Sequence, residues 1–161
     1  AGWTHVNQPM LEVDEDEFDR VFNINVKSIY LMTHAVVPLM RSQGGGVMIN
    51  IGSTAGIRPR PGLTWYNGSK GAVNLMSRSM AVELAPQGIR VNTLCPTFIE
   101  TPLTKPFLAA PGFREQVEAK IKLGRVGQVE DLMGAILLLA SDAGALMTGS
   151  ALLVDGGWTA D

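Results

Sequence analysis

Residues 47–96 read VMINIGSTAGIRPRPGLTWYNGSKGAVNLMSRSMAVELAPQGIRVNTLCP, and this stretch decides the fold. The near-continuous apolar run Val47–Ile51 predicts a buried strand, and Ile89–Cys95 predicts a second one. Between them, a loop over 52–62 that is rich in glycine and proline precedes a helical pattern over about 64–85. Two buried strands joined by a helix are typical of a parallel sheet.

Helical and strand patterns continue on both sides of this unit. Upstream, Asp14 and Glu17 form a capping-box pattern that predicts a helix to about Met40. The apolar stripe of that helix includes one polar residue, Asn25, among Phe18, Phe22, Ile29, Met32, Val36 and Met40. Downstream, the patterns predict a proline-broken loop over 97–112, a short helix over about 113–122, a helix over Glu130–Ser141 and a strand, Ala151–Val154. This alternation predicts one α/β domain whose parallel sheet is covered by helices on both faces.

The composition favours a single globular unit and argues against two classes of partner. Of the 161 residues, 46% are hydrophobic and 17% are charged, and no internal repeat or linker interrupts them. A net charge of -2 and a pI near 5.7 do not favour nucleic-acid binding. The longest apolar run, Ala135–Ala140, is far shorter than the roughly 20 residues of a membrane span. A single cysteine cannot form an internal disulfide, which favours a reducing compartment. We therefore expect a cytoplasmic protein, and from its charge and its short apolar runs we expect no nucleic-acid or membrane partner.

Polar residues follow the predicted strands at the edge where ligands bind. In open parallel sheets, ligands bind beyond the carboxyl ends of the strands. Those ends are Gly52-Ser53, Cys95-Pro96-Thr97 and Asp155-Gly156. The hydroxyl of Ser53 could there hold a substrate oxygen.

Tyr66 and Lys70 lie four residues apart on a predicted helix, so both side chains project from one face. An ammonium group beside a phenol favours the phenolate and brings a phenol pKa of ~10 toward neutrality. A general acid and base that works at physiological pH needs such a shift. By itself, however, a Tyr-x-x-x-Lys pair is more often a solvated helix face, so the pair alone does not assign a function.

The surrounding sequence closely resembles the short-chain dehydrogenase/reductase family. The matching segments, in family order and at similar spacings, are Phe22–Val26, Ile49–Ser53, Tyr66–Ala72, Ile89–Asn92, Cys95–Thr97, Thr148–Gly149 and Val154–Gly157. The resemblance implies a Rossmann-like doubly wound parallel sheet. Ala1-Gly2 resembles the end of the segment that closes the family's fourth strand. We therefore expect residues 1–161 to be a single catalytic region, the second half of a domain whose N-terminal dinucleotide-binding part is not in this chain.

Carried over position by position, the resemblance implies reversible hydride transfer between NAD or NADP and a secondary alcohol or ketone. Tyr66 is similar to the catalytic acid/base, and Lys70 to the residue that holds the nicotinamide ribose and favours the ionised tyrosine. Ser53 resembles the residue that orients the substrate oxygen and stabilises charge on it. Asn25 resembles the residue that holds a water behind the lysine. The alternative for Asn25 is a structural bridge to backbone groups, because a buried amide needs partners.

Four further positions match residues that contact the cofactor in this family. The family usually has glycine after the proline at Pro96, whereas this sequence has Thr97, whose side chain would crowd the cofactor or contribute a hydroxyl. Ile99 and Thr101 match positions whose backbone and hydroxyl groups receive the carboxamide and the phosphates. The chain contains no glycine-rich turn after a first strand and no residue in position to recognise the ribose. The choice between NAD and NADP therefore stays open.

No metal site is expected, because His5 and His34 have no partner at metal-ligand spacing. Cys95 ends a buried strand and is expected to be an inert core thiol.

The helix over Glu130–Ser141 is apolar on more than one face, and the strand Ala151–Val154 is expected at the sheet edge. We therefore expect a homo-oligomer, a tetramer or a dimer, although the extra apolar face could instead pack within its own subunit. A second hypothesis treats residues 1–161 as a catalytically silent fragment or an assembly module. On either hypothesis, this stretch alone is expected to be inactive.

Overall fold

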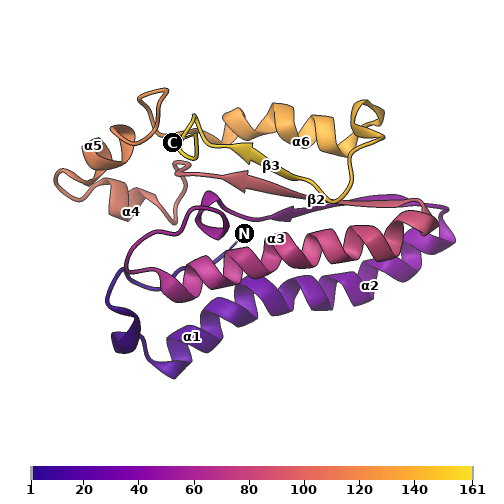
Figure 1. Cartoon of the computed structure of the whole chain (residues 1–161), viewed down its shortest axis with the longest axis horizontal. Coiled ribbons are helices and arrows are strands. Elements are labelled where there is room, and N and C mark those ends of the chain that lie inside the picture. Colours follow the sequence, from indigo (N-terminus) through magenta and orange to yellow (C-terminus); the bar gives the residue numbers. More distant parts are fainter. Residues whose placement is uncertain (1, 161) are drawn as a thin grey trace.

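Three parallel strands separate a pair of long helices from a single helix in the computed structural model, which describes residues 2–160 (Figure 1). Helices α2 and α3 lie along one face of the sheet, and α6 covers the other face. The strands are β1 (Gly46–Ile51), β2 (Ile89–Pro96) and β3 (Ala151–Val154). The helices are α1 (Glu15–Phe22), α2 (Ser28–Ser42), α3 (Thr64–Leu84), α4 (Lys105–Leu108), α5 (Phe113–Glu118) and α6 (Met133–Ala140).

The strands follow one another across the sheet in the order β1-β2-β3. Met48 pairs with Val91 between β1 and β2, and Cys95 pairs with Leu153 between β2 and β3. Because all three strands run in the same direction, their carboxyl ends meet at one edge. The predicted α/β fold with a parallel sheet and helices on both faces is confirmed.

The main core lies between the sheet and the α2–α3 pair. It consists of Val37, Met48, Ala81, Leu84, Ile89 and Val91, which are all buried. A second apolar cluster lies near the carboxyl ends of the strands and joins the segment after β2 to the C-terminal turn. Its buried members are Leu108, Val117, Ile121, Val126 and Trp158. This second cluster holds α4 and α5 beside the edge at which the strands end.

The helix predicted from Asp14 to about Met40 is divided into three parts. Asp14 caps α1, since its carboxylate accepts a hydrogen bond of 2.8 Å from the backbone N–H of Glu17. A π-helical segment, Asn23–Lys27, separates α1 from α2. Met32 was expected on the buried stripe but is 58% exposed, whereas its neighbour Thr33 is half-buried. Residues three and four positions along a helix share a face, so the pattern alone could not distinguish between them.

Three other details differ from the prediction. The loop predicted over 97–112 contains the short helix α4, and the helix predicted to about 122 ends at Glu118. The last helix begins with a 3₁₀ turn, Val129–Leu132, at whose start Gln128 and Asp131 form a capping box. The acidic residues Glu130 and Asp131 thus mark the start of a helical segment, but its first turn is a 3₁₀ turn.

Apolar side chains remain exposed on the outer side of α6 and at the β3 edge. Leu137 is 62% exposed, and Leu138 and Leu153 are also exposed. Within residues 2–160, no helix has both the length and the apolar character that crossing a membrane requires.

Candidate active site

A cleft of about 1350 Å³ lies at the carboxyl ends of the strands. The end of β1, the first turns of α3 and the end of β2 all contribute to its walls, as do the N-terminal segment and the region of α4 and α5. Of the residues that the sequence analysis selected, the cleft is lined by Ser53, Tyr66, Lys70, Pro96, Thr97, Ile99 and Thr101. Asn25 does not line the cleft. The fold therefore brings together side chains from three separate sequence segments, because parallel strands end at one edge.

Ser53 is held rigidly where β1 ends. Gly52 extends the ladder by donating a hydrogen bond of 2.8 Å to the carbonyl of Leu94. Ser53 itself is extended and buried, and its Oγ accepts a hydrogen bond of 3.1 Å from the N–H of Ala55. A side chain at position 52 would come within 2.5–2.9 Å of Asn74, Thr93 and Cys95. Glycine at position 52 thus lets the backbone before Ser53 pack closely against its neighbours.

Lys70 lies beside Tyr66 on the first turns of α3. Its Nζ is 6.0 Å from the centre of the Tyr66 ring and donates a hydrogen bond of 2.9 Å to the carbonyl of Ile51. The side chain is only 3% exposed. Burial lowers the pKa of Lys70 from 10.5 to about 8, an effect that Cys95 opposes. Below that pH, Lys70 keeps its positive charge near the phenol.

Asn25 lies in the π-helical segment and connects three parts of the chain. Its Oδ1 accepts a hydrogen bond of 2.8 Å from the N–H of Trp3, and its Nδ2 donates one of 2.8 Å to the carbonyl of Trp3. The same Nδ2 donates to Ser69 Oγ at 2.9 Å, and Ser69 Oγ donates to the carbonyl of Tyr66 at 2.7 Å. With these contacts Asn25 bridges separate parts of the chain, which is the structural role given above as the alternative for this residue. Its proposed part in holding a water stays a prediction.

Replacing Asn25 by alanine should reduce the free energy of unfolding of the full-length protein by about 1–3 kcal/mol. The substitution leaves the half-buried N–H and carbonyl of Trp3 without their Asn25 partner and removes one of the two hydrogen bonds of the buried Ser69 hydroxyl, and losses of this kind cost about that much. Chemical denaturation followed by circular dichroism measures the loss. Asn23→Ala, an exposed position in the same π-helical segment, is the matched control and should have little effect. Equal stability of the two variants would contradict a bridging role for Asn25.

The segment after β2 is held by a threonine that the sequence analysis did not select. Thr104 Oγ1 donates a hydrogen bond of 2.6 Å to the carbonyl of Ile99 and accepts one of 2.9 Å from the N–H of Thr101. Ile99 is also paired with Gly127 in an isolated bridge. Thr104 thereby fixes the backbone at both predicted cofactor positions, Ile99 and Thr101. A proline-broken loop shows no periodicity, so its sequence contained no signal for this residue.

Thr97 lines the cleft, and its hydroxyl is buried. Within residues 2–160, its Oγ1 has no hydrogen-bond partner. Because a buried hydroxyl without a partner is unfavourable, this group fits a ligand that donates or accepts a hydrogen bond. The Lys70 ammonium has three N–H donors, and the carbonyl of Ile51 accepts a hydrogen bond from one of them. The remaining donors also fit a polar ligand.

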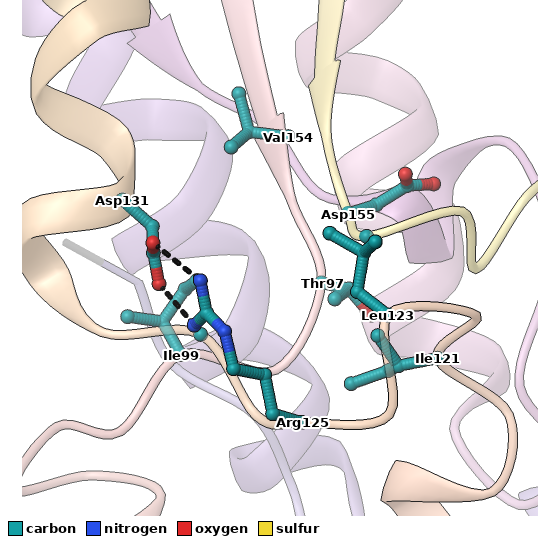
Figure 2. Close-up of a pocket in the computed structure, with 10 residues that line it drawn as sticks. Thr97, Ile99, Ile121, Leu123, Arg125, Asp131, Val154 and Asp155 are labelled. Carbon is teal, nitrogen blue, oxygen red and sulfur yellow. Dashed lines mark hydrogen bonds and ion pairs between the residues drawn. The ribbon is translucent and has the colours of Figure 1, made fainter.

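A smaller pocket of about 240 Å³ adjoins the cleft between the ends of β2 and β3, and Thr97 and Ile99 line both (Figure 2). Arg125 and Asp131 form a bidentate ion pair there, with N–O distances of 2.6 and 2.8 Å. The hydrogen bonds from Arg125 lower the pKa of Asp131 well below its usual range. Asp131 also accepts from the N–H of Gln128 at 2.7 Å. The pair therefore holds the turn before α6 and has a structural role in this pocket.

Arg60 is a further cleft residue that the sequence analysis did not select. It lies in the loop between Ser53 and Tyr66, where Arg58 and Arg60 are the only charged residues. That concentration of basic residues close to the Tyr66–Lys70 pair is the signal that could have drawn attention to it.

Cys95 is fully buried beside this site, and its Sγ donates to Asn74 Oδ1 at 3.4 Å. Burial raises the pKa of Cys95 to about 11, so the thiol stays protonated at neutral pH. In the part of the chain that the structure describes, no group of three or more His, Cys, Asp or Glu side chains could hold a metal ion.

Comparison with known proteins identifies relatives along the whole chain. A family profile described as "Enoyl-(Acyl carrier protein) reductase" matches residues 1–159. A curated relative is 4-formylbenzenesulfonate dehydrogenase of Comamonas testosteroni, which is 45% identical over 160 residues; these make up 98% of this chain and 64% of that protein.

Two solved structures show the same arrangement of elements. Gluconate 5-dehydrogenase from Burkholderia cenocepacia, in complex with NADP and tartrate, superimposes with a TM-score of 0.96 at 32% identity over 100% of this chain and 63% of that one. A 3-ketoacyl-(acyl-carrier-protein) reductase from Brucella melitensis, in complex with NADH, gives a TM-score of 0.90 at 38% identity over 99% and 64%. The chain thus spans less than two thirds of each of these proteins.

Proposed function

The chain belongs to the short-chain dehydrogenase/reductase family, and on that basis we propose that it carries the catalytic residues of an enzyme that transfers a hydride between NAD or NADP and a secondary alcohol or ketone. The observation that carries the proposal is the convergence of Ser53, Tyr66 and Lys70 on one cleft at the ends of the strands. One of the relatives is named for ketone chemistry, as a 3-ketoacyl-(acyl-carrier-protein) reductase, and it supports the same reaction class.

Each of the three side chains has a distinct part in the proposed reaction. In the oxidative direction, Tyr66 as phenolate accepts the proton of the substrate hydroxyl. The Ser53 hydroxyl holds the same oxygen while the C–O bond becomes a carbonyl. The Lys70 ammonium stabilises the phenolate. The cofactor, when bound, takes up the hydride that the carbinol carbon loses.

We assign the cofactor to the side of the cleft formed by Lys70 and the segment after β2. Lys70 would hold the ribose hydroxyls, next to Tyr66, and the proposed contacts along the segment after β2 are Pro96, Thr97, Ile99 and Thr101. The unpartnered hydroxyl of Thr97 and the unused donors of Lys70 support this assignment. Complexes of two relatives, one with NADP and one with NADH, support a nicotinamide dinucleotide and leave the choice between the two open.

The water that Asn25 is proposed to hold would lie behind Lys70 and would complete a proton relay from Tyr66 to solvent. A Cβ at Gly2 would lie 3.1 Å from Lys70 Nζ and 3.3 Å from Asn25 Oδ1, so the two polar groups border the same point in space. This proximity supports a water-holding role for Asn25 in addition to its bridging contacts.

The decisive experiment assays the full-length protein with NAD and NADP against a panel of secondary alcohols and ketones. Absorbance at the wavelength of the reduced nicotinamide reports hydride transfer directly. We expect turnover with at least one substrate class and one preferred cofactor. Tight cofactor binding without turnover of any alcohol or ketone would instead favour a silent assembly role.

We further propose that the full-length protein is a homo-oligomer, a tetramer or a dimer, that packs through α6 and β3. The exposed leucines on these two elements support the proposal, because an edge strand and an apolar helix face both need cover. Sedimentation at micromolar concentration should give a dimer or tetramer mass. Leu137→Asp should lower that mass without unfolding the protein, whereas Leu11→Asp, at an exposed position far from α6 in sequence, should leave it unchanged. A monomer mass for the unmodified protein would refute the proposal.

A further inference from the structure

The side chain of Arg60 is held in place at the wall of the cleft. Its guanidinium carbon lies 4.2 Å from the centre of the Phe98 ring and 5.3 Å from that of Trp158. Its Nη2 donates a hydrogen bond of 3.1 Å to Thr54 Oγ1, next to Ser53. The backbone is fixed as well, since the Asn67 side chain bonds both the N–H and the carbonyl of Arg60. The guanidinium is therefore pre-positioned between the Ser53 turn and an aromatic cluster.

This cation has no anionic partner within residues 2–160. No carboxylate lies within ion-pair distance of it, and its Nε is buried without a hydrogen-bond partner. Burial lowers the pKa of Arg60, an effect that Tyr66 opposes, which places the guanidinium in the electrostatic reach of the proposed acid/base. Aromatic faces attract a guanidinium but supply no counter-charge. A partly desolvated cation at a cleft wall that retains an unused donor fits the charge-assisted binding of an anion.

The charges of the cleft as a whole point the same way. Among the residues that the structure describes, its lining includes the basic residues Arg60, Lys70 and Lys120 and no aspartate or glutamate. Lys120 Nζ lies 5.9 Å from the centre of the Trp158 ring, the same ring that Arg60 contacts. Two cationic side chains, Arg60 and Lys120, thus lie at the aromatic cluster, although the net charge of the chain is -2.

We propose that Arg60 binds an anionic group of the substrate, so that the enzyme acts on secondary alcohols or ketones that bear a carboxylate or sulfonate. This inference rests on the hydride-transfer function proposed above. The cofactor phosphates are the other possible source of an anion. We assign Arg60 to the substrate because its contacts are Thr54, Phe98 and Trp158, whereas the proposed cofactor contacts are made by the segment after Pro96 and by Lys70.

The test compares ketones that differ only in charge, in the full-length protein. The pairs are 4-acetylbenzoate with 4-acetylbenzamide and 4-oxopentanoate with 4-oxopentanamide. For at least one pair, kcat/KM should be at least roughly 10-fold higher for the anion, as expected for a charge-assisted hydrogen bond. Arg60→Gln should lower kcat/KM for that anion by roughly 10- to 100-fold and change the value for the amide by less than about 3-fold.

A binding measurement separates the substrate from the cofactor. Calorimetry gives the Kd of the preferred anionic ketone for the complex of the enzyme with oxidised cofactor, in which no turnover occurs. Arg60→Gln should weaken this binding by roughly 10-fold or more and leave the Kd of the cofactor unchanged. Arg41→Gln, an exposed arginine at the end of α2, makes the same change of charge outside the cleft and should alter neither constant.

Three results would overturn the inference. The first is an unmodified enzyme that shows no preference for the anion in either pair, which would leave the hydride-transfer function intact. The second is an Arg60→Gln variant that loses cofactor affinity as strongly as anion affinity, which would assign Arg60 to the cofactor. The third is calorimetry in which neither anion binds. If Arg60→Gln does not fold, two other results decide the matter. They are the anion affinity of Arg60→Lys, which keeps the charge, and the preference of the unmodified enzyme for the anionic ketone.

Discussion

Replacing Tyr66 by phenylalanine should lower the turnover of the full-length enzyme by about 10²-fold or more. The substitution keeps the aromatic ring at the start of α3 and removes only the hydroxyl that we propose exchanges a proton with the substrate. The affinity for the cofactor should change little, because Lys70 and the segment after β2 are intact. Steady-state kinetics with a deuterated alcohol, in which an isotope effect shows that hydride transfer limits the rate, provide the measurement.

Tyr30→Phe is the matched control for this substitution. Tyr30 is 55% exposed on α2 and contacts His34, away from the cleft. The loss of its hydroxyl should leave turnover within about 2-fold of the unmodified enzyme. If Tyr66→Phe retained full turnover while chemistry limited the rate, the assignment of the acid/base would be wrong.

The second large effect is expected for Lys70→Met, which should abolish most activity while making the protein more stable. Turnover should fall by about 10²-fold or more, because the variant loses the charge that we propose stabilises the phenolate and holds the ribose. The pKa of Lys70 falls from 10.5 to about 8 on folding, and a shift of that size corresponds to about 3 kcal/mol of unfavourable burial. Loss of the hydrogen bond to Ile51 would cost about 1 kcal/mol. A net gain of about 1–2 kcal/mol at pH 7 follows.

The gain should depend on pH in a defined window. Below pH 8 the lysine is protonated in both the folded and the unfolded chain, so the penalty of burying its charge is present in full. Between pH 8 and 10.5 the unfolded chain binds the proton more tightly, and the stability of the unmodified protein therefore rises with pH relative to the variant. The advantage of Lys70→Met should shrink across this window and disappear above it.

Urea denaturation of the cofactor-free protein at pH 7 and at pH values up to 10.5 tests this expectation. Lys105→Met, an exposed lysine at the start of α4, is the control and should show no comparable dependence on pH. A Lys70→Met variant that is less stable than the unmodified protein at pH 7 would show that the ammonium contributes more through its contacts than its burial costs.

Features with a local cause could be predicted from the sequence. The run Val47–Ile51 and the pattern over 64–85 predict a strand and a helix because hydrophobic periodicity depends on neighbours in the chain. Tyr66 and Lys70 share a face because residues four apart always do on a helix. Since parallel strands end at one edge, the shared strand direction placed Ser53 and Pro96 at the same edge of the sheet.

Tertiary structure decided the contacts that cross the chain. Asn25 bonds Trp3 and Ser69, which are 22 and 44 positions away, and its buried position on the apolar stripe did not reveal which groups it would meet. The Asp14–Met40 pattern likewise contained no sign of the π-helical segment in which Asn25 lies.

The sequence by itself thus determined the parallel α/β fold and the Ser53, Tyr66 and Lys70 positions, because short-range periodicity and strand direction specify both. Only the tertiary structure decided where Arg60 would lie. Its loop has no periodicity, and its surroundings are formed by Phe98 and Trp158 from distant segments. The charge and desolvation of a side chain depend on everything that packs around it, so they can be read only once the chain has folded.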